Sequence, residues 1–265
     1  LRIMSNSVIS LGLGLGGGKS ATSSGRAAGG GGLSNLFSVD FDGINDHMAV
    51  TPSSTIQLYG LSVWFNCDHV IDKDTVRGVV LGPSGVNWFL GFGGNFTSLL
   101  NNEIISINTG ARYGYGSSSA SIAKGWHNVV AAWSTSSATN GGNDGYDIWL
   151  DGVKVGNEAN TNFGAATLFS LPTSTIAFGR RADGNYPFAG KLDEIAVFSS
   201  LLSASNIATI YNSGVPGDLT DLSPAGWWRM GDNDGGSGTT ITDQGSGSNN
   251  GTLTNGPTFS SSVPS

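Results

Sequence analysis

The sequence has little charge, a single cysteine and no long apolar run. Only 12% of its 265 residues are charged, and the formal net charge is −7 with no cluster of basic side chains. This argues against nucleic acid as a partner, because binding a phosphate backbone requires Lys and Arg. With one cysteine, Cys67, no internal disulfide can form, which favours assembly in a reducing compartment. No apolar run reaches the roughly 18 residues of a membrane-spanning helix, so no membrane contact is predicted.

Common metal and nucleophile motifs are also missing. His47, His69 and His127 are far apart in the sequence, which gives no support for a zinc site. There is no G-x-S-x-G motif of the kind that exposes a nucleophilic serine. The segment GLGLGGGKS at 12–20 approaches a phosphate-binding loop, but Leu13 stands where the motif requires glycine. The glycine-interrupted N-terminal residues also do not match a signal peptide.

Glycine and aromatic residues are abundant instead. There are 42 glycines, seven Trp and twelve Phe, a composition that favours turns around an aromatic core over a helical bundle. Short runs rich in β-branched and aromatic residues, bounded by Gly, Asn, Asp and Ser, are typical of β-strands. These runs are FSVDFDG, HMAVT, LSVWFNC, RGVVLG, NWFLGFG, EIISINTG, WHNVVAAWS, YDIWLDG, VKVG, STIAFGR and LDEIAVF. The hairpin YDIWL–DG–VKVG is the clearest of them, because Asp151–Gly152 suits a two-residue turn with positive φ at both positions.

One segment, 188–214, predicts a strand followed by a compact helix. The strand is expected at Leu192–Phe198, and the helix begins after Ser203, which suits an N-cap, and ends near Gly214. Its apolar face consists of Ile207, Ile210 and Tyr211. Many strands with a single short helix predict an all-β fold, an antiparallel jelly-roll β-sandwich with the helix as a cap.

Composition divides the chain into three parts. Residues 1–36 form a Gly/Ser-rich arm, which is either a disordered tail or an extended segment that adds as a strand to a neighbouring subunit. Residues 37–216 hold most predicted strands, and residues 217–265 return to strands and turns, including GWWRMGD and a short strand near Thr252–Leu253.

Several of these segments resemble the LamG-like domains of the concanavalin A-like lectin/glucanase superfamily. The matching segments, in the order of that family, are FSVDFDGINDHMAV at 37–50, LSVWFN at 61–66, GWHNVVAAWS at 125–134, YDIWLDGVKVG at 146–156 and FAGKLDEIAVFSSLLSASNIATIYNSG at 188–214. The resemblance implies a concanavalin A-like jelly roll.

One departure from the family order is informative. The segments WWRMGDNDG at 227–235 and DQGSGSNNGTL at 243–253 resemble pieces that usually come first, yet here they come last. This indicates a circular permutation, or the start of a truncated second repeat. Because the termini of a sandwich usually lie close together, the permuted strands are able to complete the same sandwich.

The resemblance does not imply catalysis. Glucanases of the superfamily use paired carboxylates, typically E-x-D-x-x-E on one strand, and none of the three glutamates begins such a motif. Asp193 and Glu194 are adjacent on a predicted strand, so strand alternation is expected to send them to opposite faces. A non-enzymatic protein is predicted, with a glycoside hydrolase as the weakest alternative.

Calcium is the metal that the sequence favours. Asp42, Asn45 and Asp46 crowd one predicted turn, and the resemblance implies that Asp193 lies near it. The alternative is that Asp42 and Asp46 form Asx turns around Gly43.

For glycan binding the expected platform is aromatic, with nearby amide and carboxylate groups that fix hydroxyls. Trp149 has an alternative role in packing between the sheets, whereas the loops RYGYGSSS and RRADGNYPF are expected at the surface. The candidate glycan-binding residues are Tyr113, Tyr115, Trp149, Asp183, Asn185 and Tyr186.

The glycine-rich arm, the LamG-like middle and the WWRMGD…GTLTNGP tail together resemble virion structural proteins of marine tailed phages. This implies a homo-oligomeric structural or decoration protein of the virion, assembled in the host cytoplasm. The arm would contact other virion proteins, and the loops would contact cell-surface glycans. The alternative is a secreted or surface carbohydrate-binding module of a bacterium.

Overall fold

The computed structural model describes residues 33–72, 78–83, 89–92, 105–108, 112–115, 121–137, 142, 144–155 and 168–265. Residues 32–265 form one compact unit, and the predicted arm falls almost entirely in the separate unit Leu1–Gly31, outside the described residues. None of the helices in the described part is long and apolar enough to cross a membrane.

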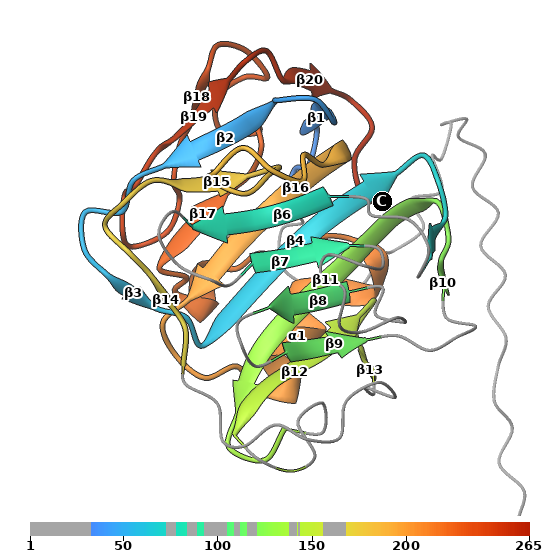
Figure 1. Cartoon of the computed structure of the whole chain (residues 1–265), viewed down its shortest axis with the longest axis vertical. Coiled ribbons are helices and arrows are strands. Elements are labelled where there is room, and N and C mark those ends of the chain that lie inside the picture. The colour runs from blue at the N-terminus through green and yellow to red at the C-terminus, as the bar shows by residue number, and fades with distance from the viewer. Residues whose placement is uncertain are drawn as a thin grey trace, which may run out of the picture. The chain divides into compact units, whose positions relative to one another are not determined.

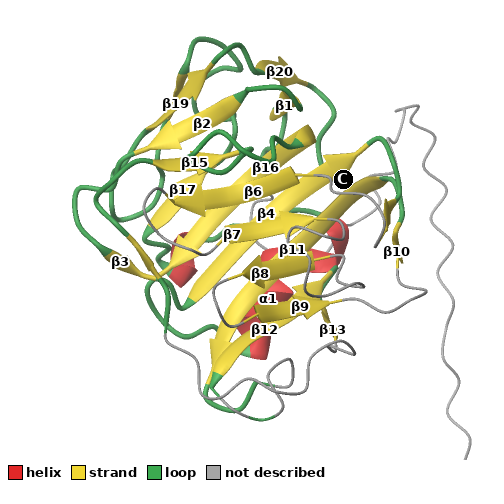
Figure 2. Ribbon diagram, in the orientation of Figure 1, coloured by secondary structure: helices red, strands yellow, loops and turns green. Residues whose placement is uncertain are grey.

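Two antiparallel sheets of eight strands each form the fold (Figures 1 and 2). The strands of sheet A, in spatial order, are β13 (Val153–Val155), β12 (Gly145–Leu150), β11 (Gly125–Ser134), β4 (Gly60–Cys67), β16 (Ala189–Phe198), β1 (Ser38–Asp42) and β20 (Thr258–Ser260), with β17 (Gly226–Trp228) also paired to β16. Those of sheet B are β18 (Thr240–Ile241), β19 (Gly251–Thr254), β2 (His47–Val50), β15 (Ile176–Phe178), β6 (Gly78–Pro83), β7 (Phe89–Phe92), β8 (Ile105–Asn108) and β9 (Arg112–Tyr115). The predicted all-β sandwich is confirmed.

Smaller elements lie at the margins of the sandwich. They are the two-stranded pairs β10 (Ser121–Ile122) with β5 (Ile71–Asp72) and β14 (Ser170–Leu171) with β3 (Ile56–Gln57), the helix α1 (Ala204–Tyr211), and the 3-10 turns η2 (Asn212–Gly214) and η3 (Thr220–Leu222).

The main core lies between the sheets and follows strand alternation. On β4, Leu61, Val63 and Phe65 point into this core, while Trp64 faces the opposite side of sheet A. Phe65 stacks on Phe92 of β7, with ring centroids 4.0 Å apart, and so joins the two sheets. The period-2 pattern of the sequence therefore identifies the inner face directly.

The helix α1 packs on the outer face of sheet A. Its Ile207 and Ile210 are buried in a second apolar cluster with residues of β11 and β16. Tyr211 stacks on Trp64 at 5.8 Å between ring centroids. This confirms the prediction of one short helix capping the sandwich, with the apolar face expected from the sequence.

The caps of α1 agree with the prediction at one end only. Ser203 is the N-cap, and it forms a reciprocal capping box with Asn206. At the other end Asn212, not Gly214, is the C-cap residue, with φ of 43° in the left-handed region. Asn tolerates this conformation better than most residues, so the helix ends earlier than the glycine suggested.

The hairpin between β12 and β13 has the predicted turn. Asp151 has φ of 50° and Gly152 has φ of 74°, so both central residues are in the left-handed region. Trp149 pairs with Lys154 across it.

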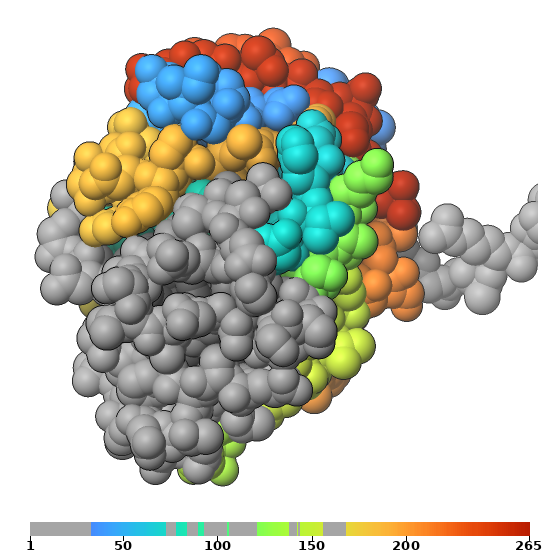
Figure 3. Space-filling model, turned by 45° about the vertical axis from the view of Figure 1, so that its right-hand side comes forward, coloured from blue at the N-terminus to red at the C-terminus, as the bar shows by residue number. Residues whose placement is uncertain are grey.

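Strands from residues 217–265 belong to both sheets. β17 pairs with β16, β20 pairs with β1, and β19 pairs with β2. Figure 3 shows the first described residues, in blue, beside the last ones, in red, on one part of the surface. The end of the chain is therefore an integral part of the sandwich.

A β-bulge interrupts β16 at Asp193 and Glu194. The register with β4 shifts between Asp193 and Ala196, and Glu194 has φ of 43°. Leu192 and Ile195 both point into the core between the sheets, which leaves both acidic residues on the outer face. The prediction that alternation separates them is wrong, because a bulge adds a residue to one strand and breaks the alternation.

Candidate functional site: a pocket at one end of the sandwich

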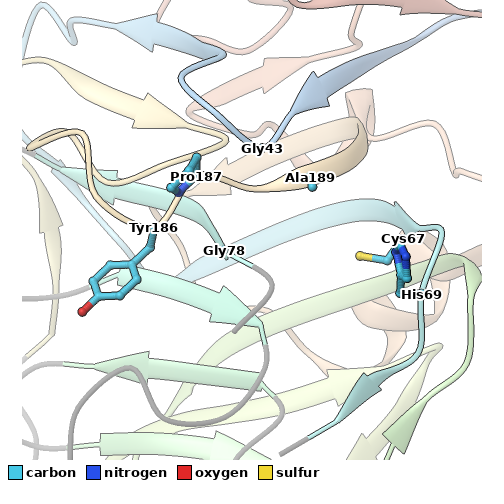
Figure 4. Close-up of a pocket in the computed structure, with 7 residues that line it drawn as sticks. All are labelled: Gly43, Cys67, His69, Gly78, Tyr186, Pro187 and Ala189. Atoms are coloured by element: carbon cyan, nitrogen blue, oxygen red, sulfur yellow. The ribbon is translucent and has the colours of Figure 1, made fainter. Parts of the chain in front are cut away.

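The candidate site is a pocket of about 440 Å³ where four separate segments meet, and it is called the first pocket below. It lies between the β1–β2 turn, the end of β4, the start of β6 and the loop that leads into β16 (Figure 4). In the figure, Tyr186 and Pro187 stand on one side of the pocket and Cys67 and His69 on the other. Its lining residues are Gly43, Cys67, His69, Gly78, Tyr186, Pro187 and Ala189.

Two glycines allow these segments to approach each other. A Cβ at Gly78, where φ is +109°, would lie 2.5 Å from the carbonyl oxygen of Pro187. A Cβ at Gly43, where φ is +73°, would lie 2.7 Å from the Cβ of Ala189. Both positions combine a left-handed backbone with close packing, so only glycine fits without a local shift.

The loop between β15 and β16 is fixed by its own polar groups. Asp183 Oδ1 accepts a hydrogen bond of 3.0 Å from the backbone N–H of Asn185, and Asp183 Oδ2 lies 3.1 Å from Arg181 Nη2. Although partial burial raises the pKa of Asp183, its hydrogen bonds from Asn185 and the charge of Arg181 outweigh this and lower the pKa. The carboxylate is therefore ionised at neutral pH and holds the loop.

Tyr186 is anchored on the same loop at the mouth of the pocket. Its carbonyl accepts a hydrogen bond of 2.9 Å from the backbone N–H of Val79, and its φ is 53°. The guanidinium of Arg181 lies over its ring, 5.9 Å from the centroid. Tyr186 is half-buried, whereas Asp183 and Asn185 are exposed, so the predicted residues of this loop do lie together.

The β1–β2 turn contains three of the predicted calcium ligands. Asp42 Oδ1 accepts hydrogen bonds from the backbone N–H groups of Ile44 and Asn45, and these bonds lower the pKa of Asp42. Asp46 Oδ2 accepts a hydrogen bond from the N–H of Asp42. Its Oδ1 is buried without a partner, and burial raises the pKa of Asp46. Asp42 thus forms the Asx turn that the sequence offered as the alternative, whereas Asp46 bonds back to the backbone of Asp42.

The structure does not bring Asp193 to this turn. Leu192 pairs with Val39 and Ala189 pairs with Asp42, so Asp193 is about four strand residues, or roughly 13 Å, from Asp42. Asp193 Oδ2 instead accepts a hydrogen bond from Asn35 Nδ2. Among the described residues, no group of three or more His, Cys, Asp or Glu is placed to hold a metal ion. The expected proximity of Asp193 to the turn is therefore wrong.

The remaining glycan candidates lie elsewhere. Trp149 is half-buried against the apolar cluster on the outer face of sheet A, rather than between the sheets. Tyr113 and Tyr115 belong to β9, paired with Ile107 and Ile105 of β8, and not to a loop as predicted. Tyrosines at alternate positions favour a strand, and the glycine between them does not prevent it. The side chains of the two tyrosines are outside the described residues.

Sequence reasoning missed most of the pocket lining. Cys67 was considered only for disulfides and His69 only for zinc, and nothing local to Gly78 or Pro187 suggests a pocket. The available signal was Tyr186 followed by proline in a polar loop, and that residue was identified.

Comparison with known proteins places the fold. Residues 42–208, more than half of the chain, match the family model Laminin_G_3, described as the concanavalin A-like lectin/glucanases superfamily. The chain belongs to this superfamily. The superfamily predicted from the sequence is thus confirmed. No curated protein sequence matches the chain.

Solved structures share the superfamily fold at low identity. A proposed carbohydrate-binding protein from Bacteroides ovatus superposes with a TM-score of 0.58 at 18% identity, over 88% of this chain and 62% of that one. This chain thus spans less than two thirds of that protein. A heptameric pentraxin from Limulus polyphemus gives a TM-score of 0.42 at 13% identity, over 67% of this chain and 82% of the pentraxin. At 18% identity, the likeness to the Bacteroides ovatus protein shows a common fold alone.

Proposed function

We propose that this protein is a non-enzymatic carbohydrate-binding module that holds a sugar at the first pocket. The observation that carries the proposal is that Tyr186, a half-buried aromatic residue, lines the pocket from the loop that also carries the exposed Asp183 and Asn185. Sugars offer apolar C–H faces to aromatic rings and hydroxyls to amide and carboxylate groups. Membership of a lectin/glucanase superfamily supports the same function.

The absence of acidic residues from the pocket lining supports binding over hydrolysis. Glycoside hydrolysis needs two carboxyl groups about 5–9 Å apart across the scissile bond. The described lining of the first pocket contains neither Asp nor Glu. The acidic pair on β16 is closed off, because Asp193 has 0% and Glu194 has 2% of its surface exposed. We therefore assign recognition, and not cleavage, to this end of the sandwich.

The test is a glycan array followed by calorimetric titration of the sugars that bind. We expect Tyr186→Ala to weaken binding at least about tenfold, since it removes the stacking surface. Val153→Ala, which shortens an exposed side chain on β13, is the matched control and should bind as the parent does. Unchanged affinity in both Tyr186→Ala and Asp183→Ala would refute the site. Titrations in calcium chloride and in EDTA test whether Asp42 and Asp46 assist through calcium.

The place of the protein in a virion, as a homo-oligomer anchored by the arm, stays a prediction from the sequence. The structure sharpens its test, because Ser34, Asn35 and Leu36 make contacts within the compact unit. We therefore expect a deletion of residues 1–31 to remove most of the arm and to keep the contacts of residues 34–36. Loss of particle incorporation on this deletion supports anchoring, and normal incorporation argues for the secreted or surface module.

A further inference from the structure

A second pocket of about 450 Å³ lies at the opposite end of the same two strands. The first pocket is lined by Cys67, at the end of β4, and Ala189, at the start of β16. The second is lined by Tyr59, just before β4, and Ser199, just after β16. Because β4 is eight residues long, the two pockets are separated by roughly 26 Å of strand.

Half of the residues that line the second pocket carry uncharged polar groups that face solvent and bond to no other described residue. The amide of Gln57, the phenol of Tyr59 and the hydroxyls of Ser54, Thr55 and Ser199 form no hydrogen bond with another described residue. The described lining contains no Asp, Glu, Lys, Arg or His. A ligand that fits must therefore offer many neutral donors and acceptors, and it gains nothing from a charge of either sign.

One buried side chain presents a donor to the pocket from a loop that is already in place. Asn249, with 8% of its surface exposed, lines the pocket, and its Oδ1 accepts a hydrogen bond of 2.8 Å from the N–H of Ser53. Its Nδ2 has no acceptor among the described residues. Gly247 lines the pocket beside this amide, and a Cβ there would collide with Asn249 Nδ2. The missing side chain leaves the amide uncovered.

The loop that carries Asn249 is fixed by a buried carboxylate. Asp243 accepts hydrogen bonds of 2.7 Å each from the N–H groups of Trp227, Gly245 and Asn249. The carbonyl of Asn249 accepts a further bond of 2.9 Å from Trp228 Nε1. A ligand at this loop therefore meets donors that are already positioned, which reduces the entropic cost of binding.

We propose that the second pocket is a separate binding site for a neutral saccharide. Its volume falls within the range of about 300–1,000 Å³ that is usual for small-ligand sites. The hydroxyls of a sugar ring are able to bond to the amides of Gln57 and Asn249 and to the hydroxyls of the serine and threonine residues. Tyr59 adds an aromatic edge. The two pockets share no lining residue, so this proposal does not depend on binding at Tyr186. A chain with both sites is able to bridge two glycan strands.

The test is an NMR titration of the full-length, ¹⁵N-labelled chain. The probes are the neutral hexasaccharides of cellulose, xylan, mannan and arabinan, and hexagalacturonate as the anionic comparison. We expect at least one neutral probe to shift the side-chain amide signals of Gln57 and Asn249, and hexagalacturonate to leave them unchanged. Absence of any shift with all four neutral probes, or a preference for hexagalacturonate, overturns the proposal.

Two variants assign the signal to this pocket. The double variant Gln57→Ala and Tyr59→Phe removes only groups that have no partner, so its stability should match the parent. We expect it to bind the positive probe at least tenfold more weakly at the second pocket, while Tyr186→Ala leaves that binding unchanged. Shifts of the Asn249 side-chain amide that survive at the parental strength in the double variant overturn the proposal. In Tyr186→Ala, loss of shifts only at the backbone amides of Gly43 and Gly78 concerns the first pocket alone, so the two proposals fail separately.

Discussion

The two faces of sheet A are built on different principles. On the inner face Val63, Phe65 and Leu192 are fully buried, and their neighbours in the core between the sheets are apolar. On the outer face Asp193 and Glu194 are equally buried, with 0% and 2% of their surface exposed. The inner face is stabilised by removal of apolar area from water, whereas the outer face depends on each charge having a partner.

Glu194 is the best-paired charge of the outer face. Its Oε1 accepts a hydrogen bond of 2.8 Å from Arg229 Nε, and its Oε2 accepts one of 2.6 Å from Trp227 Nε1. Arg229 also donates from Nη2 to the carbonyl oxygen of Ser34 at 2.6 Å and to Asp232 at 3.0 Å. One cation thus holds two carboxylates and the segment that precedes β1.

Asp193 and Asp232 tie the same segment down. Asp193 accepts a hydrogen bond of 3.1 Å from Asn35 Nδ2, and Asp232 Oδ1 accepts bonds of 2.7 Å and 3.1 Å from the N–H groups of Leu36 and Phe37. Of these three buried carboxyls only Glu194 and Asp232 bond to Arg229, and burial raises the pKa of Asp232 as it does for Asp193 and Glu194. The outer face therefore holds excess negative charge.

The largest effect is expected from Arg229→Ala. Removing Arg229 leaves the buried carboxyl of Glu194 without its cation, at a cost of about 3–5 kcal/mol in the free energy of unfolding. Chemical denaturation measures it. The double variant Arg229→Met and Glu194→Gln should cost less than Arg229→Ala alone, because Glu194 no longer carries a charge that needs the arginine. A cost below about 1 kcal/mol for Arg229→Ala would show that the two faces do not differ in this way.

A comparable change on the inner face is Leu192→Ala. Leu192 precedes the bulge and is fully buried, so the substitution leaves a cavity and should cost about 2–5 kcal/mol. Because only apolar packing is lost, the cost should be the same at pH 5 and pH 8, as measured by denaturation at both. If the cost of Leu192→Ala in the free energy of unfolding changed strongly with pH, packing on the inner face would be coupled to the protonation of Asp193 and Glu194.

The variant Asp193→Asn tests how the buried acidic residues of the outer face make the stability of the fold depend on pH. Burial raises the pKa of Asp193 well above its usual range and raises the pKa of Glu194 from 4.5 to about 7. A carboxyl whose pKa is higher in the folded state stabilises the fold fully below its unfolded pKa. That contribution is lost as the pH rises through the folded pKa, so stability should decline between about pH 4.5 and pH 7.

Asp193→Asn should flatten this decline and make the protein more stable at pH 8 by on the order of 1 kcal/mol. Thermal unfolding across pH 4 to pH 8 measures both effects. The exposed Asp221→Asn is the control and should leave the pH profile of the parent intact. A steeper decline in Asp193→Asn than in the parent would contradict the proposed excess of negative charge.

The same contrast explains what the sequence could predict. Alternation located the inner face, and local chemistry at Asp151–Gly152 and Ser203 located a turn and a helix start, because each signal lies within a few residues. The bulge at Asp193–Glu194 escaped prediction because it depends on Trp227 and Arg229, which are more than thirty positions away.

The first pocket shows the same limit. Tyr186 was identified because its loop is polar and aromatic, but Gly43, Cys67 and Gly78 line the pocket only once distant strand ends have met. The sequence also gives no sign that Asn249 lines the second pocket, because its position depends on hydrogen bonds to Asp243 and Ser53.

The smallest effect is expected at the helix that covers the outer face. Ser203 Oγ accepts a hydrogen bond of 3.1 Å from the N–H of Asn206, and the N–H of Ser203 donates to Asn206 Oδ1 at 2.8 Å. Ser203→Ala should therefore cost about 1 kcal/mol, and Ser205→Ala, at the second residue of the helix, is the control that should cause no loss. The cost stays small because Ile207 and Ile210 remain packed on sheet A and hold the helix in place. Denaturation measures both variants. A cost near that of Arg229→Ala would mean that the outer face depends on the helix cap more than on its ion pairs.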